Sequence, residues 1–338
     1  MKNNFMNLPS EPKISIIIPC LDGLEYIDDL FQALQKQTYP NFEIIFVNSA
    51  CTNSENIANK LSSYTDLDIK IISTPPLFPG DARNLGIESA GSSLIAFLDI
   101  KTIPSNTWLE NTYEYKISNN YDIVLGKFIC HADTDFQESV KAVTFGNTPS
   151  DSLPGSLLSK KLFYEIGGFL EDCRAGEDEE WLGRIHNSNF SLGTMSTATL
   201  IYLGLPIQPA DLVKKWFFYS IKSAPINVAN SQKGAYFFSM FLLVVYFFLN
   251  WNYIFTNDQW DESEYFVPHI NKIVWSIFFL IYIFFRGIFL PYKRRVNFEY
   301  ILPYKWLLLI YAGLLIDLSK LPGRILGYFY FLKSKLTN

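Results

Sequence analysis

The sequence predicts an α/β domain with a mostly parallel sheet, followed by apolar helices in the C-terminal part of the chain. Two observations support this prediction. Runs rich in β-branched residues alternate with amphipathic segments through residues 1–205, and strands that alternate with helices indicate a parallel sheet covered by helices. From residue 234 onwards, two long stretches carry at most one charge each, and they are long enough to cross the hydrocarbon core of a bilayer.

The composition agrees with a chain made of two such parts. Its 338 residues are 49% hydrophobic and 18% charged, whereas an ordinary soluble domain has roughly 25% charged residues. The formal net charge of −5 argues against a nucleic-acid partner, because nucleic-acid binding needs a basic surface. Four cysteines and three histidines are scattered without metal-ligand spacing, so no structural zinc site is expected.

The elements of the N-terminal part follow one another in regular order. We expect strands at 13–20, 42–48, 68–73 and 93–99, and helices at 26–37, 54–63 and 81–90. Ligands bind beyond the carboxyl ends of the strands in such sheets. Those ends carry Pro19, Cys20, Leu21, Asp22, Asn48, Ser49, Asp99 and Lys101. A ligand site is therefore expected at this edge.

Three segments occur in the order that is typical of a known enzyme family. They are IIIPCLDGLEYIDDLFQALQKQTYPNFEIIFVNSA, PGDARNLGIESAGSSLIAFLDIKTIP, and GSLLSKKLFYEIGGF with AGEDEEWLGRI. By these segments, residues 13–200 resemble the family 2 glycosyltransferases of the GT-A fold, a Rossmann-like nucleotide-diphospho-sugar transferase domain. The resemblance implies transfer of a sugar from a nucleotide-diphosphate donor to an acceptor, usually with inversion at the anomeric carbon.

The resemblance also implies which residues contact the donor. They are Pro19, Cys20, Asp22, Asn48, Ser49, Arg83, Asn84, Asp99 and Lys101. The family usually carries two acids at the end of the second strand, where this chain has the uncharged Asn48 and Ser49. Arg83 and Asn84 match the family's Ala-Arg-Asn segment beside the donor. A salt bridge on the helix surface is the alternative role for Arg83.

The segment Asp99-Ile100-Lys101 departs from the family's Asp-x-Asp motif, which binds a divalent metal ion. A protonated lysine cannot ligate a metal. In one explanation Lys101 neutralises the diphosphate, helped by Arg83 and the Lys214-Lys215 pair. In the other, Asp99 holds Mg²⁺ or Mn²⁺ together with water and phosphate oxygens. We favour retained metal use at Asp99, and an inactive site is the third possibility.

A cluster of acids, from Glu177 to Glu180, opens a predicted helix. It follows GSLLSKKLFYEIGGF, where the family carries a Glu-Asp pair, so the resemblance implies that Asp178 is the general base and Glu177 its neighbour. The alternative is a capping cluster, because the helix dipole favours acids at the N-terminus. Trp181 is expected either to stack on a sugar of the acceptor or to pack in the helix core.

The C-terminal part is divided into three predicted segments. Residues 206–233 are expected to form interfacial helices, 234–256 and 272–291 a transmembrane hairpin, and 302–332 a third apolar segment. The loop between the hairpin helices is acidic, and Lys293-Arg294-Arg295 follows the hairpin, so the N-terminal domain is expected in the cytoplasm. Because the tail is also basic, we expect the third segment to be re-entrant or interfacial, broken at Pro322-Gly323.

Together these patterns predict an inverting glycosyltransferase in the inner or plasma membrane. Its expected partners are a nucleotide-diphosphate sugar, a lipid-linked or cell-envelope glycan acceptor, and membrane lipids. The uncharged positions 48 and 49 and Lys101 leave open a catalytically silent relative that serves as a membrane scaffold in a glycan-assembly complex. A third alternative is transfer of the sugar onto polyprenyl phosphate.

Overall fold

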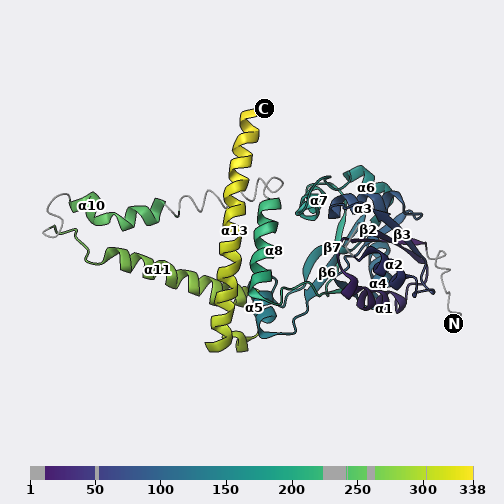
Figure 1. Cartoon of the computed structure of the whole chain (residues 1–338), viewed down its shortest axis with the longest axis horizontal. Coiled ribbons are helices and arrows are strands. Elements are labelled where there is room, and N and C mark those ends of the chain that lie inside the picture. The colour runs from purple at the N-terminus through teal and green to yellow at the C-terminus, as the bar shows by residue number, and fades with distance from the viewer. Residues whose placement is uncertain are drawn as a thin grey trace. The chain divides into compact units, whose positions relative to one another are not determined.

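The computed structural model of the chain describes residues 12–49, 53–223, 241, 243–256, 263–301 and 303–337 (Figure 1). Its contacts divide the chain into two units, of which one comprises residues 1–132 and 148–205 and the other residues 133–147 and 206–338. Residues 133–147 fall within the predicted N-terminal domain of residues 1–205, and their contacts group them with the C-terminal helices.

A nine-stranded sheet forms the centre of the N-terminal unit. Its parallel half runs in the order β3 (Ile69–Thr74), β2 (Phe42–Ser49), β1 (Ile14–Cys20) and β4 (Leu94–Phe97). The other half contains β7 (Ser150–Ser159), β6 (Ile123–Cys130), β9 (Leu200–Tyr202) and β5 (Thr102–Pro104), with β8 (Leu192–Thr194) beside β6. The four predicted strands are confirmed. The second half, where β7 is antiparallel to β4 and β6, was not predicted.

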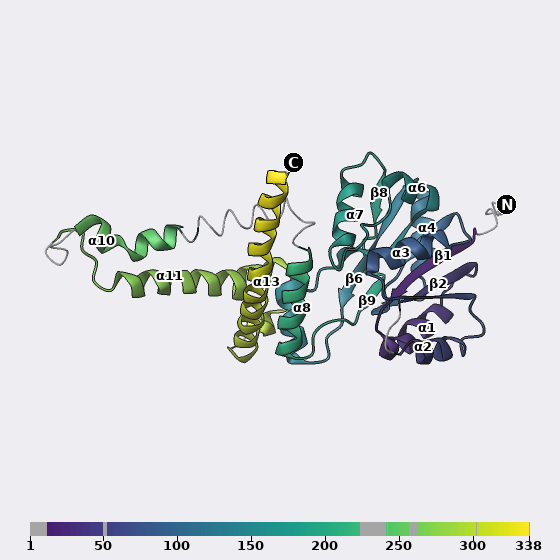
Figure 2. The same ribbon diagram turned by 45° about the horizontal axis from the view of Figure 1, so that its top comes forward.

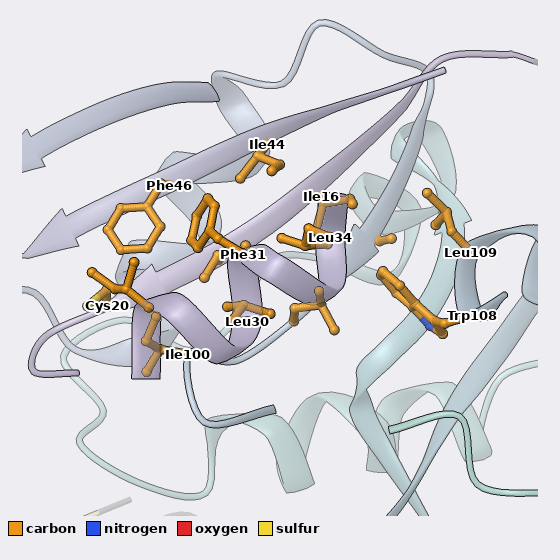
Figure 3. Close-up of a cluster of buried hydrophobic side chains, with 14 of the residues drawn as sticks. Ile16, Cys20, Leu30, Phe31, Leu34, Ile44, Phe46, Ile100, Trp108 and Leu109 are labelled. Atoms are coloured by element: carbon orange, nitrogen blue, oxygen red, sulfur yellow. The ribbon is translucent and has the colours of Figure 1, made fainter. Parts of the chain in front are cut away.

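Side chains of β1 and β2 alternate between two hydrophobic cores, one on each face of the sheet. On one face Ile16 and Phe46 pack with α1 (Ile27–Gln35), α2 (Ser54–Leu61) and α4 (Trp108–Ser118). Figure 3 shows Phe31 and Leu34 of α1 in this cluster. Burial on both faces explains why the centres of these strands, Ile16–Ile18 and Ile44–Val47, are consecutive apolar residues.

The second core lies on the opposite face of the sheet. Here Ile17 and Val47 pack with α3 (Pro79–Glu88), α6 (Lys160–Ile166) and α7 (Glu177–His186). Figure 2 shows α3 on one side of β1 and β2, with α1 and α2 on the other. This arrangement carries the N-terminal halves of α3 and α7 to the edge where β1, β2 and β4 end.

The C-terminal unit consists of helices. They are α5 (Asp135–Thr144), α8 (Pro209–Ser223), α10 (Trp251–Thr256), α11 (Ile270–Phe284), a π-helical turn η3 (Phe285–Phe289), α12 (Leu290–Lys293), a 3₁₀ turn η4 (Phe298–Ile301) and α13 (Pro303–Thr337). Among the described residues, Ile270–Lys293 and Pro303–Gly323 are long and apolar enough to cross a membrane. Only 17% of the apolar window of Ile270–Lys293 is buried, which is unlike the core helix of a soluble protein.

Two of the predicted apolar segments can be compared with these helices. The predicted span 272–291 lies inside Ile270–Lys293. Of the predicted span 234–256, residues 234–240 and 242 lie outside the described residues, and the rest is mostly helical.

Helix α13 continues through Pro322, so the expectation of a break at Pro322-Gly323 is wrong. A Cβ atom on Gly323 would come within 2.2 Å of the carbonyl carbon of Ser220 in α8, and the Ser220 hydroxyl donates to the carbonyl of Ser319 at 3.4 Å. Proline removes one backbone hydrogen bond from a helix. Close packing along α8 stabilises α13 on both sides of that interruption.

Candidate active site

A pocket of about 380 Å³ opens where β1, β2 and β4 end. It is lined by Pro19, Cys20, Leu21, Asp22, Ser49, Leu77, Pro79, Ala82, Arg83, Asp99, Ile100, Lys101, Arg174 and Tyr202. Of the residues that the resemblance implied for the donor, all but Asn48 and Asn84 line this pocket. The predicted place of the site, beyond the carboxyl ends of the parallel strands, is the place where the pocket lies.

Arg83 is the central charged residue of the pocket. Its side chain is only 5% exposed, and it donates to Asp99 Oδ1 and to Glu177 Oε1, each at 2.8 Å. Burial by itself lowers the pKa of Arg83, but the nearby carboxylates of Asp99 and Glu177 outweigh burial and raise it above its ordinary value. Arg83 is therefore a permanent cation that joins α3 to β4 and α7, and not a surface ion pair.

The two acids at the start of α7 differ in their surroundings. Glu177 is 4% exposed, and burial raises its pKa against the opposing charge of Arg83. Asp178 is half-buried, and its Oδ1 accepts the backbone N–H of Glu179 at 2.9 Å. Asp178 is thus the more accessible carboxylate of the pair. Its charge also contributes to the raised pKa of Arg83, so it lies near that guanidinium.

The asparagines that the resemblance placed at the donor serve the backbone around the site. Asn48 is fully buried, and its Nδ2 donates to the Ser54 hydroxyl at 2.8 Å. Asn84 Nδ2 donates to the carbonyl of Phe169 at 2.9 Å, while Asn84 Oδ1 accepts the N–H of Phe169 at 2.9 Å. Asn48 therefore fixes the start of α2, and Asn84 fixes the loop that precedes α7.

Trp181 packs in the core and does not face the pocket. Its exposed fraction is 0%, its Nε1 donates to the carbonyl of Gly167 at 2.9 Å, and its ring packs against Phe97, Phe163 and Phe169. No ring face is open to a sugar. The expectation that Trp181 stacks on the acceptor is therefore dropped in favour of the core role.

Several pocket residues were not identified from the sequence. Arg174 comes from the exposed loop before α7, and Tyr202 comes from β9 in the half of the sheet that was not predicted. Burial raises the pKa of Tyr202 to about 12, so its hydroxyl stays protonated. The segment CRAGEDEE places Arg174 next to the acids, and that proximity was the available signal.

The segment at the end of β4 has few side chains that could ligate a metal ion. Asp99 is the one carboxylate of the Asp99-Ile100-Lys101 segment, and one of its oxygens already accepts a hydrogen bond from Arg83. In the part of the chain that the structure describes, no three His, Cys, Asp or Glu side chains gather as a metal-binding group. These residues do not fit a metal held by protein ligands alone. The expectation that Asp99 holds Mg²⁺ or Mn²⁺ together with water and phosphate oxygens does not require such a group and stays a prediction.

The sequence has relatives among known proteins. Residues 15–176 match the model of glycosyl transferase family 2. The glycosyltransferase AglE of Haloferax volcanii is 25% identical over 199 residues, which are 54% of this chain and 64% of that protein. The putative glycosyltransferase EpsH of Bacillus subtilis is 27% identical over 158 residues, 45% of this chain and 44% of that protein. The matched part is thus less than two thirds of either relative.

Solved structures also resemble the chain. The mannosyltransferase PcManGT from Pyrobaculum calidifontis, in complex with GDP-Man and Mn²⁺, has a TM-score of 0.48 and 16% identity over 64% of each chain. TarS 1–349 of S. aureus, in complex with UDP-GlcNAc, has a TM-score of 0.46 and 15% identity over 91% of this chain and 92% of that one. By the match over residues 15–176 and the mixed α/β sheet, the N-terminal unit contains a glycosyl transferase family 2 domain with the GT-A fold.

Proposed function

We propose that the protein is an inverting glycosyltransferase that moves a sugar from a nucleotide-diphosphate donor to an acceptor hydroxyl. The observation that carries the proposal is the pocket at the ends of β1, β2 and β4, in which Arg83 lies between Asp99 and Glu177. Ligands of doubly wound α/β sheets bind at this edge. The cations Arg83, Lys101 and Arg174 line the pocket. The acids Glu177 and Asp178 are not lining residues, but they lie near Arg83 at the start of α7.

The donor is proposed to bind along the strand ends. The loop Pro19–Asp22 and Ser49 would hold the nucleoside, because these residues line the pocket beside one another at the ends of β1 and β2. The cations Lys101 and Arg174 line the same pocket and would face the diphosphate. A positive charge near the leaving group stabilises the negative charge that develops as the bond to the sugar breaks.

Asp178 is proposed as the general base. The acceptor hydroxyl passes its proton to the Asp178 carboxylate while its oxygen forms a bond to the anomeric carbon. The bond from that carbon to the diphosphate breaks on the opposite face, and the nucleoside diphosphate leaves with the electron pair. Glu177 is less suited to this role, because it is buried and its carboxylate accepts a hydrogen bond from Arg83.

The acceptor is proposed to be a lipid-linked or cell-envelope glycan at the cytoplasmic face of a membrane. Two helices, Ile270–Lys293 and Pro303–Gly323, support this proposal by their length and apolar composition. Lys293 ends the first of them and Arg294 and Arg295 follow it, and basic residues favour the cytoplasmic side of a membrane. The protein would then be a multi-pass membrane enzyme with its catalytic unit in the cytoplasm.

Transfer assays on the full chain in detergent test the proposal. Nucleotide sugars and lipid-linked acceptors are supplied as panels, and transfer is followed by mass spectrometry, which also reveals polyprenyl monophosphate sugars. Asp178→Asn is expected to lower kcat about 100-fold or more, as loss of a general base does. The control is Glu179→Gln, because Glu179 is an exposed acid of the same helical turn. Equal activity of Asp178→Asn and wild type would contradict the assignment of the base.

A catalytically silent relative is the second candidate, favoured by the lysine at position 101. Calorimetry with UDP, GDP and dTDP separates the two candidates. A silent scaffold without a donor site binds none of the three, with or without Mn²⁺. Binding of any one of them together with detectable sugar transfer excludes that candidate.

A further inference from the structure

We propose that the ammonium group of Lys101, and not a divalent metal ion, neutralises the diphosphate of the donor. The inference rests on the proposed function and specifies how its donor site works. It begins from the residues at the end of β4, which offer one carboxylate, Asp99, already bonded to Arg83 at 2.8 Å, and an ammonium group at position 101.

The main chain holds Lys101 firmly at the mouth of the pocket. The carbonyl of Asp99 accepts the N–H of Thr102 at 3.0 Å and its hydroxyl at 2.6 Å, which closes a tight turn around residues 99–102. The carbonyl of Lys101 accepts the N–H of Leu203 at 2.9 Å. The backbone of Lys101 is thereby fixed between β4 and β9, and its side chain lines the pocket.

The charge of Lys101 is available to a ligand. Its Nζ lies 4.9 Å from the ring centroid of Tyr26, and the structure gives it no ion pair within the described ranges. A cation held over an aromatic face is bound more weakly than one that donates a charge-assisted hydrogen bond to a phosphate. Tyr26 can thus hold the ammonium group in place and release it to a phosphate oxygen.

The balance of charge explains why a metal is not needed. Two carboxylates together with one divalent cation carry no net charge, and one carboxylate together with one ammonium group carries none either. Asp99 and Lys101 therefore present to the diphosphate the same net charge as an acid pair loaded with metal. The remaining acid of this segment, Asp99, has an oxygen engaged by Arg83 at 2.8 Å, and position 101 supplies no second carboxylate beside it.

Arg174 provides a second cation in the same pocket. It is exposed on the loop before α7 and lines the pocket with Lys101. Its guanidinium can bind a phosphate through two parallel N–H donors, which a lysine cannot do. Lys101 and Arg174 together supply two positive charges, as many as a divalent metal ion.

The test is the affinity of the full chain in detergent for UDP, GDP and dTDP, measured by calorimetry in EDTA and again in MnCl₂. The wild type is expected to bind its preferred nucleotide in EDTA with a Kd within about threefold of that in MnCl₂. Lys101→Met keeps the aliphatic chain and removes the charge, so it should raise Kd roughly ten- to a hundredfold under both conditions. Lys70→Met, at an exposed lysine that contacts the carbonyl of Ser89, is the matched control and should leave Kd unchanged.

A charge-reversal variant distinguishes binding by the lysine from binding through a metal ion. Lys101→Asp restores a pair of acids and is expected to abolish binding in EDTA but to allow binding in MnCl₂. Electron paramagnetic resonance of Mn²⁺ in the absence of nucleotide should then detect more bound ion in Lys101→Asp than in the wild type. Thermal unfolding of each variant shows whether it is folded.

The outcomes distinguish this inference from the proposed function. Binding by the wild type that disappears in EDTA and returns with Mn²⁺ would overturn the role of Lys101 and leave the proposed function intact. An unchanged affinity of Lys101→Met for the nucleotide diphosphate would also overturn the role of Lys101 and leave the proposed function intact. Failure of the wild type to bind any nucleotide diphosphate, under either condition, would overturn both proposals.

Discussion

Arg83 and Glu177 lie 94 positions apart in the chain, yet the Arg83 guanidinium donates to Glu177 Oε1 at 2.8 Å inside the domain. The same guanidinium donates to Asp99 at the end of β4. Three elements that are distant in sequence, α3, β4 and α7, therefore meet in one buried ion network. This network fixes the start of α7, and with it the proposed base Asp178, relative to the pocket.

Removing the charge of Arg83 is expected to destabilise the protein. Arg83→Met leaves Asp99 and Glu177 without their cation, and breaking a buried ion pair costs about 3 kcal/mol or more. Arg83→Lys keeps the charge but cannot make both hydrogen bonds in the same geometry. It should therefore lower the free energy of unfolding by less than Arg83→Met does. Thermal unfolding of the full chain measures both variants.

The matched control for Arg83 is an exposed ion pair. Lys161 and Glu165 pair at 3.5 Å on α6, and the Lys161 side chain is 87% exposed. Lys161→Met should change the free energy of unfolding by less than about 1 kcal/mol. If Arg83→Met unfolds at the same temperature as Lys161→Met, the buried network does not stabilise the domain.

Gly86 and Gly183 form a second matched pair, because both are helical glycines with different surroundings. A Cβ atom on Gly86 would come within 2.7 Å of Ile17 Cγ2 in β1, whereas a Cβ atom on Gly183 would meet nothing within 4 Å. Gly86→Ala is expected to cost about 1–3 kcal/mol through overpacking. Gly183→Ala should stabilise the protein by roughly 0.5–1 kcal/mol, because alanine is the better helix former.

Denaturant titration of the two alanine variants checks this prediction. Gly86 lies on the face of α3 that contacts β1 and β2, so its variant also reports whether α3 must approach the sheet so closely. A stability of Gly86→Ala equal to that of Gly183→Ala would contradict the close contact.

Asp122 predicts a dependence of stability on pH. Its pKa is lowered, first by the hydrogen bond from the Ser191 N–H and then by that from the Ser191 hydroxyl, both of which reach Oδ2 at 2.8 Å. A carboxyl group whose pKa is lower in the folded protein stabilises the fold above its ordinary pKa of 3.8. That contribution is lost as the pH falls below 3.8 through the lower value of the folded protein.

Asp122→Asn isolates this contribution. Its unfolding temperature should be below that of the wild type at pH 7, and the difference should shrink as the pH falls below about 3.8. Circular dichroism of both proteins across pH 2–7 checks the trend. A difference that stays constant with pH would show that ionisation of Asp122 does not stabilise the joint between β6 and β8.

Local sequence pattern was sufficient for the parallel half of the fold. The central positions Ile16–Ile18 of β1 and Ile44–Val47 of β2 are consecutive apolar residues because both faces are buried, and that pattern is visible in the sequence. The residues at the strand ends were also found, because strand-end loops have a fixed place in such sheets. The acids of α7 were found through the family resemblance of the segment that carries them. The short strands β5, β8 and β9 have three residues each. Three residues are too few to show the alternation of apolar and polar side chains that identifies a strand.

The roles of single side chains depended on partners that sequence pattern does not specify. Asn48, Asn84 and Trp181 are polar or amphipathic residues at suitable positions for a ligand, but each is committed to a buried hydrogen bond with the backbone or a neighbouring side chain. The break expected at Pro322 failed for the same reason, since the neighbour that stabilises α13 there is α8, about 100 positions earlier in the chain.

The C-terminal unit holds a buried ion pair whose removal should destabilise it. Arg286 is 8% exposed, and its Nε and Nη2 donate to the two carboxylate oxygens of Asp317 at 2.7 and 2.5 Å. Tyr282 donates to the same carboxylate at 3.1 Å, and Arg286 also contacts the carbonyl of Val143 in α5 at 3.4 Å. Both charged residues lie in apolar helices, where an unpaired charge is costly.

A double-mutant cycle measures the coupling of this pair. Arg286→Met and Asp317→Leu each leave one charge unpaired and should each lower the free energy of unfolding by about 3 kcal/mol or more. The double variant leaves no unpaired charge. Its free energy of unfolding should therefore fall by clearly less than the sum of the decreases in the two single variants. Unfolding of the full chain in detergent gives the four values. Additive losses would mean that Arg286 and Asp317 stabilise the helices independently, and that the carbonyls of Val143 and Gly313 are sufficient partners for Arg286.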